Sequence, residues 1–173
     1  MSPKNLLIKA YTLTTQFARP AVYSIIILLM RIIWGYQFFI TGRGKLGDIQ
    51  KPIAFFTDLG IPFPTANAYL VGTVECFGGL LLLLGLGSRW VSLALVINMT
   101  VAYLTAHRAS LGPLFQNGET WDFAGQAPFW FLTTSIIVLA LGPGCVSLDA
   151  LAKFLFFRHD LTKPKLASQS QPD

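Results

Sequence analysis

The chain has 173 residues, of which 53% are hydrophobic and only 12% are charged. About a quarter of the residues of a soluble domain are charged, so the composition argues against an ordinary water-soluble protein and indicates a single integral membrane domain. The net charge of +5 does not predict a nucleic-acid partner, because the basic residues lie mostly beside apolar stretches, where membrane proteins carry them.

Four apolar stretches predict membrane-spanning helices, since a helix needs about 20 apolar residues to cross a bilayer. These stretches are residues 20–41, 66–86, 89–107 and 123–142, all approximate. The predicted fold class is therefore an all-α membrane protein, a four-transmembrane-helix bundle over residues 20–151. Residues 1–19 form an N-terminal arm, and residues 152–173 form a tail that is predicted to be disordered, because it is polar after Phe157.

The segment between the first two stretches, residues 48–60, predicts a short helix on the outer membrane surface. Asp48 is a candidate N-cap, Ile53 and Phe56 share a helical face, and Gly60 fits the end of the helix. The alternative is a plain loop that buries its pair of aromatic residues.

Basic residues predict the direction of the four spans. An even number of spans places both termini on one side, and that side carries Lys4, Lys9, Arg19, Arg89, Lys153, Arg158, Lys163 and Lys165. The other side carries Arg43, Lys45, Lys51 and Arg108. The positive-inside rule then predicts a multi-pass protein with both termini in the cytoplasm.

Three polar residues fall near the middle of three different spans: Arg31, Glu75 and Asn98. A charge at the centre of a spanning helix costs roughly 2.5–3.5 kcal/mol, so such residues usually face protein or water and have a partner. We expect an inward-facing cluster in which Arg31 and Glu75 form an ion pair. The pair either fixes the helices structurally or lines a pocket for a ligand, a proton or a quinone head group.

Two further residues are secondary site candidates. His107 ends the third span and is either a proton donor or acceptor or an ordinary interfacial residue. Lys45 lies just beyond the first span and is either an interfacial anchor or part of a site. The two cysteines and two histidines form no metal-ligand spacing, so no metal site and no covalently held cofactor is expected.

Three blocks of the sequence carry a family resemblance. The first follows R-x3-G-x2-F-x3-G-x2-K, with Arg31, Gly35, Phe38, Gly42 and Lys45. The second follows E-x2-G-G-x-L-L-x-L-G-L from Glu75 to Leu86, with basic Arg89 after it. The third is G-P-G-x-x-S-L-D, with Gly142, Pro143, Gly144, Ser147, Leu148 and Asp149. Together they resemble the DoxX family over about residues 28–151.

This resemblance implies a four-helix protein of the bacterial inner membrane. It also implies a subunit associated with a redox complex, of the kind in which a sulfur compound such as thiosulfate is oxidised by a quinone. Such a subunit would anchor the complex or bind quinone without carrying a redox cofactor, and any enzymatic activity would belong to a quinone-linked oxidoreductase. The implied partners are the lipid bilayer, a redox protein and further copies of the chain; the alternative is a non-catalytic assembly or scaffold protein with a structural Arg–Glu pair.

Overall fold

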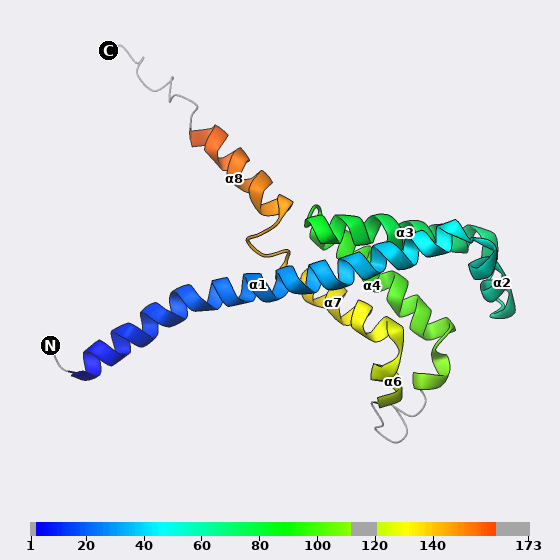
Figure 1. The fold of residues 1–173 in the computed structure, drawn as a ribbon, viewed down its shortest axis with the longest axis horizontal. Coiled ribbons are helices and arrows are strands. Elements are labelled where there is room, and N and C mark those ends of the chain that lie inside the picture. Colours follow the sequence, from blue (N-terminus) through cyan, green and yellow to red (C-terminus); the bar gives the residue numbers. More distant parts are fainter. Residues whose placement is uncertain (1–2, 112–120, 162–173) are drawn as a thin grey trace, which may run out of the picture.

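The computed structural model describes residues 3–111 and 121–161, and within these ranges every regular element is a helix (Figure 1). The predicted all-α class is therefore confirmed. The helices are α1 (Pro3–Gly47), α2 (Gln50–Asp58), α3 (Pro64–Leu84), α4 (Ser88–Thr105), the short 3-10 helix η1 (Arg108–Ser110), α6 (Trp121–Gly125), α7 (Ala127–Leu141) and α8 (Leu148–Leu161).

Two helical segments are long and apolar enough to cross a membrane, namely Ala21–Gly47 of α1 and the whole of α3. Helix α7 is apolar but shorter. The outer faces of these helices are covered by exposed aliphatic side chains, such as Ile25, Ile33, Leu70 and Ile136. Soluble monomers rarely leave such continuous apolar surface uncovered, so these faces are suited to contact with lipid.

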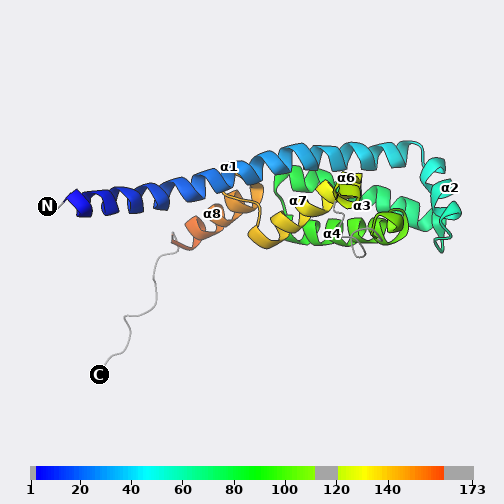
Figure 2. The ribbon, with the colours of Figure 1, turned by 90° about the horizontal axis from the view of Figure 1, so that it is seen from below.

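Helices α1, α3, α4 and α7 pack against one another along one half of the molecule, while the N-terminal half of α1 extends beyond them (Figure 2). Their shared core contains Phe38, Leu82, Leu95, Met99 and Val138. The fourth predicted stretch is divided: α6 ends at Gly125, and α7 begins next to Pro128, which occupies the first turn where its missing N–H is tolerated. Whether all four packed helices cross the membrane remains a prediction.

Glycines allow α1 and α3 to approach at backbone distance. A side chain at Gly42 would overlap the backbone of Cys76, and one at Gly79 would stand 2.7 Å from the carbonyl oxygen of Gly35. Small residues at such positions let membrane helices pack closely. Because of this close contact, the last turns of α1 pack against the middle of α3.

The predicted helix between the first two spans is present as α2, although its position on a membrane surface remains a prediction. Asp48 does not cap it: the N-cap is Ile49, without a side-chain bond, and Asp48 instead pairs with Lys51 at 2.8 Å. The predicted end is confirmed, because Gly60 has a positive φ of 68° and its N–H donates to Thr57 O.

Both ends of the chain carry more helix than the sequence predicts. The predicted arm and the first span are one continuous helix, α1, which begins at Pro3. Helix α8 covers residues 152–161 of the segment predicted as disordered, and Ser147 caps it, since Ser147 Oγ accepts a hydrogen bond from the Ala150 N–H at 3.1 Å. The remainder of that segment, 162–173, lies outside the described residues.

Candidate functional site

Three side chains from three helices meet inside the bundle and are called the polar cluster below: Lys45, Glu75 and Asn98. The Lys45 ammonium donates to both carboxylate oxygens of Glu75 at 2.6 Å, and Asn98 Nδ2 donates to Glu75 Oε1 at 3.2 Å. Glu75 is only 2% exposed. A buried carboxylate is tolerated when it is paired and hydrogen-bonded in this way.

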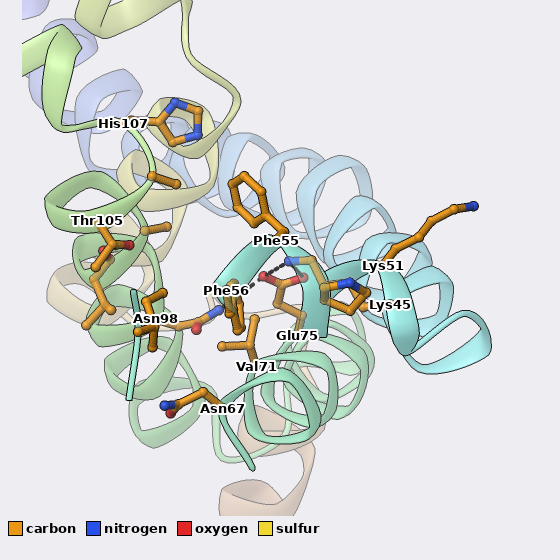
Figure 3. Close-up of a pocket in the computed structure, with 15 residues that line it drawn as sticks. Lys45, Lys51, Phe55, Phe56, Asn67, Val71, Glu75, Asn98, Thr105 and His107 are labelled. Carbon is orange, nitrogen blue, oxygen red and sulfur yellow. Dashed lines mark hydrogen bonds and ion pairs between the residues drawn. The ribbon is translucent and has the colours of Figure 1, made fainter. Parts of the chain in front are cut away.

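The polar cluster opens onto a cavity of about 470 Å³ (Figure 3). Helices α1, α2, α3 and α4 all contribute to its walls, which are mostly apolar. The apolar lining residues are Pro52, Phe55, Phe56, Ile61, Val71, Val101, Ala102 and Ala106. Ligand sites commonly have this form, with volumes of about 300–1,000 Å³ and a few convergent polar groups.

The other polar residues of the cavity stand apart from the cluster. His107 lies at the far end of the cavity from Glu75, beyond Phe55 (Figure 3), and its ring contacts Tyr103 edge-on with centroids 6.0 Å apart. Lys51 pairs with Asp48, whose hydrogen bond and charge raise the pKa of Lys51. Neither of these basic side chains therefore takes part in the hydrogen bonding of the cluster.

Arg31 does not belong to the cluster, and the predicted Arg31–Glu75 pair is wrong. Arg31 is 1% exposed, and its guanidinium donates four hydrogen bonds to backbone carbonyls. Its Nε bonds to Leu82 O at 2.9 Å and its Nη2 to Leu83 O at 3.0 Å, while its Nη1 bonds to Pro143 O at 2.7 Å and Val146 O at 2.8 Å.

The helix register explains this separation. Gly42, rather than Arg31, packs against the backbone at Glu75, and these two α1 positions lie about 16 Å apart along the axis at 1.5 Å per residue. Arg31 instead stands at the C-terminal end of α3, where unpaired carbonyls and the helix dipole attract a cation. The three polar residues therefore do not share one depth, because α1 begins far outside the bundle.

The contact between Glu75 and Asn98 is as predicted, and Lys45 takes the place expected for Arg31. Lys45 lies in the last turn of α1, which runs to Gly47, not beyond the end of the span. A signal was present in the sequence, because Lys45 follows Gly42 by three residues and so shares its face of the helix. No pattern of this kind in the sequence predicted that Phe55 and Phe56 would line the cavity.

The third sequence block, from Gly142 to Asp149, forms the loop around Arg31 and closes this end of the bundle. Asp149 Oδ1 accepts from the Gly87 N–H at 2.8 Å, and Oδ2 accepts from the Ser88 N–H at 3.0 Å. Partial burial favours the neutral carboxyl, but these N–H donors outweigh it, so the pKa of Asp149 lies below its usual value.

The fold and the site define a class: a helical membrane protein with a buried lysine–glutamate–asparagine cluster under an apolar cavity. Comparison with known proteins gives its family. The DoxX family model matches residues 26–108, a range that includes the polar cluster, Arg31 and His107, and the chain belongs to the DoxX family.

Two relatives match over most of their length. The "Putative oxidoreductase CatD" of Bacillus subtilis (strain 168) is 30% identical over 124 residues, which cover 70% of this chain and 83% of that protein. The "Inner membrane protein YphA" of Escherichia coli (strain K12) is 26% identical over 139 residues, covering 75% and 91% respectively. No solved structure matches the chain.

Proposed function

We propose that this chain is an inner-membrane subunit of a redox system, and that its cavity binds the head group of a quinone. The observation that carries the proposal is the buried Glu75 carboxylate, held by Lys45 and Asn98 at the end of a cavity with apolar walls. A quinone needs such an environment, with apolar surface for its ring and tail and a few polar groups for its two oxygens. The name of the CatD relative supports a redox setting, and that of YphA supports the inner membrane.

The residues of the cavity fit such a ligand. The volume of about 470 Å³ suits one substituted ring with part of its tail. Lys45 Nζ and Asn98 Nδ2 are the donors that would bind a quinone oxygen, and Glu75 would hold a proton at its carboxylate. Phe55 and Phe56 of α2 would exclude water from the ring. A bound quinone would supply two-electron redox chemistry in combination with a partner protein, while this chain supplies no redox group of its own.

The proposed topology has α1, α3, α4 and α7 crossing the inner membrane, both termini in the cytoplasm and α2 on the outer surface. Glu75 lies near the middle of α3 and Lys45 lies in the last turn of α1, so the cluster would stand in the outer half of the bilayer. The cavity reaches from there to α2 and His107, at the outer end of the bundle. A ligand with a long apolar tail would therefore reach the cluster from the membrane interior or from its outer surface.

A direct binding measurement tests this proposal. The purified chain in detergent would be titrated with short-chain ubiquinone and menaquinone analogues, with binding followed by isothermal titration calorimetry. We expect saturable binding of at least one analogue by the wild type, and at least about tenfold weaker binding by Asn98→Ala, which removes one hydrogen-bond donor to a buried ligand.

Two further variants make the test specific. Ala102→Phe fills the cavity without changing the polar cluster and should abolish binding, whereas Arg43→Gln, at an exposed position on α1, should bind as the wild type does. If the wild type binds neither analogue, or if Ala102→Phe binds as well as the wild type, the proposed quinone site is wrong.

The second candidate function is that of a non-catalytic assembly or scaffold protein. The Arg31 network favours a structural role for that residue, because its hydrogen bonds all go to the chain's own backbone. In this case the cavity would only separate the helices. The chain would then bind no quinone and would co-purify with a redox polypeptide whose turnover is unchanged by Asn98→Ala.

A further inference from the structure

A second cavity, of about 720 Å³, lies at the opposite end of the bundle from α2. It is formed where the α3–α4 turn, the loop after α7 and the first turns of α8 come together (Figure 1). The residues that matter for its chemistry are Tyr23, Arg89, Trp90, Lys153 and Phe156. These five residues define the basic groove.

The groove contains two cations, Arg89 and Lys153, and one anion, Asp149, whose charge interacts with that of Lys153, so the groove has a net positive charge. Arg89 is exposed and lies over Gly142, where an added methyl group would stand 3.7 Å from Arg89 Nε. Across the described part of the chain, neither Arg89 nor Lys153 forms a hydrogen bond through its side chain or an ion pair. Asp149 is the acidic residue lining the groove, and both of its oxygens already accept backbone N–H groups.

Aromatic and apolar side chains surround these cations. Trp90 is 81% exposed and Phe156 is 77% exposed, and the Tyr23 hydroxyl donates to Leu141 O at 2.7 Å. The rings of tryptophan and tyrosine are amphipathic and collect at the level of lipid head groups. From Trp90 an exposed apolar surface continues along α4 through Leu93 and Ile97.

We propose that the basic groove binds an anionic phospholipid. Its phosphate would lie between Arg89 and Lys153, and its acyl chains would lie on the exposed apolar face of α4. Charge complementarity selects an anion, and the exposed rings and aliphatic side chains select one that carries hydrocarbon tails. In the proposed topology this end faces the cytoplasm, where anionic lipids attract basic residues at the membrane surface.

This inference is independent of the proposed quinone site, because the two cavities share no lining residue and lie at opposite ends of the bundle. Anionic lipid binding would fix the position of α8 against the bundle, since Lys153 and Phe156 belong to α8 while Arg89 and Trp90 belong to α4. The groove would thus join the cytoplasmic helix to the membrane domain through the lipid.

Native mass spectrometry of the full chain in a mild detergent tests the inference, with dioleoyl phosphatidylglycerol and dioleoyl phosphatidylcholine as probes. We expect the wild type to prefer phosphatidylglycerol, and the Arg89→Gln/Lys153→Gln variant to bind it about tenfold or more weakly. The matched control is Arg43→Gln/Arg108→Gln, which removes two exposed charges at the other end of the bundle and should leave the preference unchanged.

Two further arms separate a lipid site from a simple charge effect. Ala152→Trp fills the groove without changing its charge and should also weaken phosphatidylglycerol binding, while millimolar inorganic phosphate should not displace the lipid. Wild-type binding by the Arg89→Gln/Lys153→Gln variant overturns the inference. So does an equal loss in the matched control, normal binding by Ala152→Trp, or displacement by phosphate alone.

Discussion

Two basic residues of α1, Arg31 and Lys45, both point into the bundle, but they donate hydrogen bonds to different acceptors. The planar guanidinium of Arg31 presents a fixed fork of donors, which suits several carbonyls at once. The ammonium of Lys45 is a compact charge, and it binds one carboxylate through both oxygens. Arg31 therefore holds backbone segments together, whereas Lys45 belongs to a cluster that faces a cavity.

Replacement of Arg31 should destabilise the protein strongly. Arg31→Gln has at most two N–H donors, so at least two of the four carbonyls lose theirs. We expect a loss of at least about 3 kcal/mol, since each bond to a charged donor contributes roughly 1.5–3 kcal/mol. Arg31→Lys keeps the charge but not the fork of donors and should lose nearly as much. The measurement is thermal unfolding of the purified variants in detergent.

The same measurement tests whether Arg31 and Glu75 interact. Arg31 and Glu75 bind different partners, and Gly42, the α1 residue that packs at Glu75, lies about 16 Å from Arg31 along α1. The effects of Arg31→Gln and Glu75→Gln should therefore add within about 0.5 kcal/mol. If Glu75→Gln instead restores stability to Arg31→Gln, the two residues form the pair that the sequence suggested, and the described network is wrong.

At the scale of elements, α8 fastens the end of the bundle through Asp149. The Asp149 carboxylate occupies the N-terminus of α4, where unpaired N–H groups and the helix dipole favour a negative charge, and its own N–H donates to Gly85 O at 3.0 Å. Asp149 thus joins three helices, because Gly85 ends α3, Ser88 begins α4 and Asp149 itself lies in the first turn of α8.

This arrangement predicts a pH-dependent contribution to stability. The pKa of Asp149 is lower in the folded protein than in the unfolded chain, so its stabilisation is fully present above the unfolded pKa of about 3.9 and is lost as the pH falls through the folded pKa. Asp149→Asn, which can accept through only one oxygen, should lower stability by about 0.5–2 kcal/mol at pH 7.

The difference between wild type and Asp149→Asn should shrink as the pH falls below about 4, because the wild-type carboxyl then becomes neutral as well. Thermal unfolding at a series of pH values measures this difference. A difference that stays constant down to pH 3 would show that the carboxylate charge at the α4 terminus contributes nothing.

The sequence predicted where the helices begin and end more readily than how deep a residue lies in the bundle. The apolar stretches 66–86 and 89–107 predicted α3 (Pro64–Leu84) and α4 (Ser88–Thr105) closely, because the apolar runs end at Gly and polar turns. Depth could not be predicted in this way for Arg31, since α1 is longer than the bundle and residue counts from its apolar start do not measure depth. Helix α8 was missed because the prediction of disorder rested on the polar residues after Phe157, whereas residues 148–157 are mostly apolar.

The polar cluster was predictable in part for a related reason. Glu75 and Asn98 lie on adjacent antiparallel helices joined by a short turn, so their similar distances from that turn place them together. Lys45 reaches Glu75 only because glycines bring α1 against α3 in one register. The cavity depends on the packing of α2 against α3, a tertiary contact with no local sequence pattern.

At the scale of the whole molecule, exposed apolar surface runs along the length of the helices, and basic residues gather at one end of the bundle. Large exposed aliphatic side chains cover α1, α3 and α4, while Arg89 and Lys153 gather at the end that carries α8. Two segments are long enough to cross a membrane by length and composition. The close packing of α4 and α7 against them suits a bundle of four spans, because a lipid-facing pair alone would leave the polar cluster uncovered.

Cysteine labelling distinguishes four spans from two. In a Cys76→Ser background, a membrane-impermeant maleimide would be applied to spheroplasts and to inverted vesicles, with exposed probe positions at Thr57→Cys in α2, Ala109→Cys after α4 and native Cys145 before α8. Four spans with cytoplasmic termini predict that T57C and A109C react in spheroplasts, and that Cys145 reacts in inverted vesicles. If only α1 and α3 cross, T57C still reacts from outside, but A109C reacts from the same side as Cys145. The position after α4 therefore decides the number of spans.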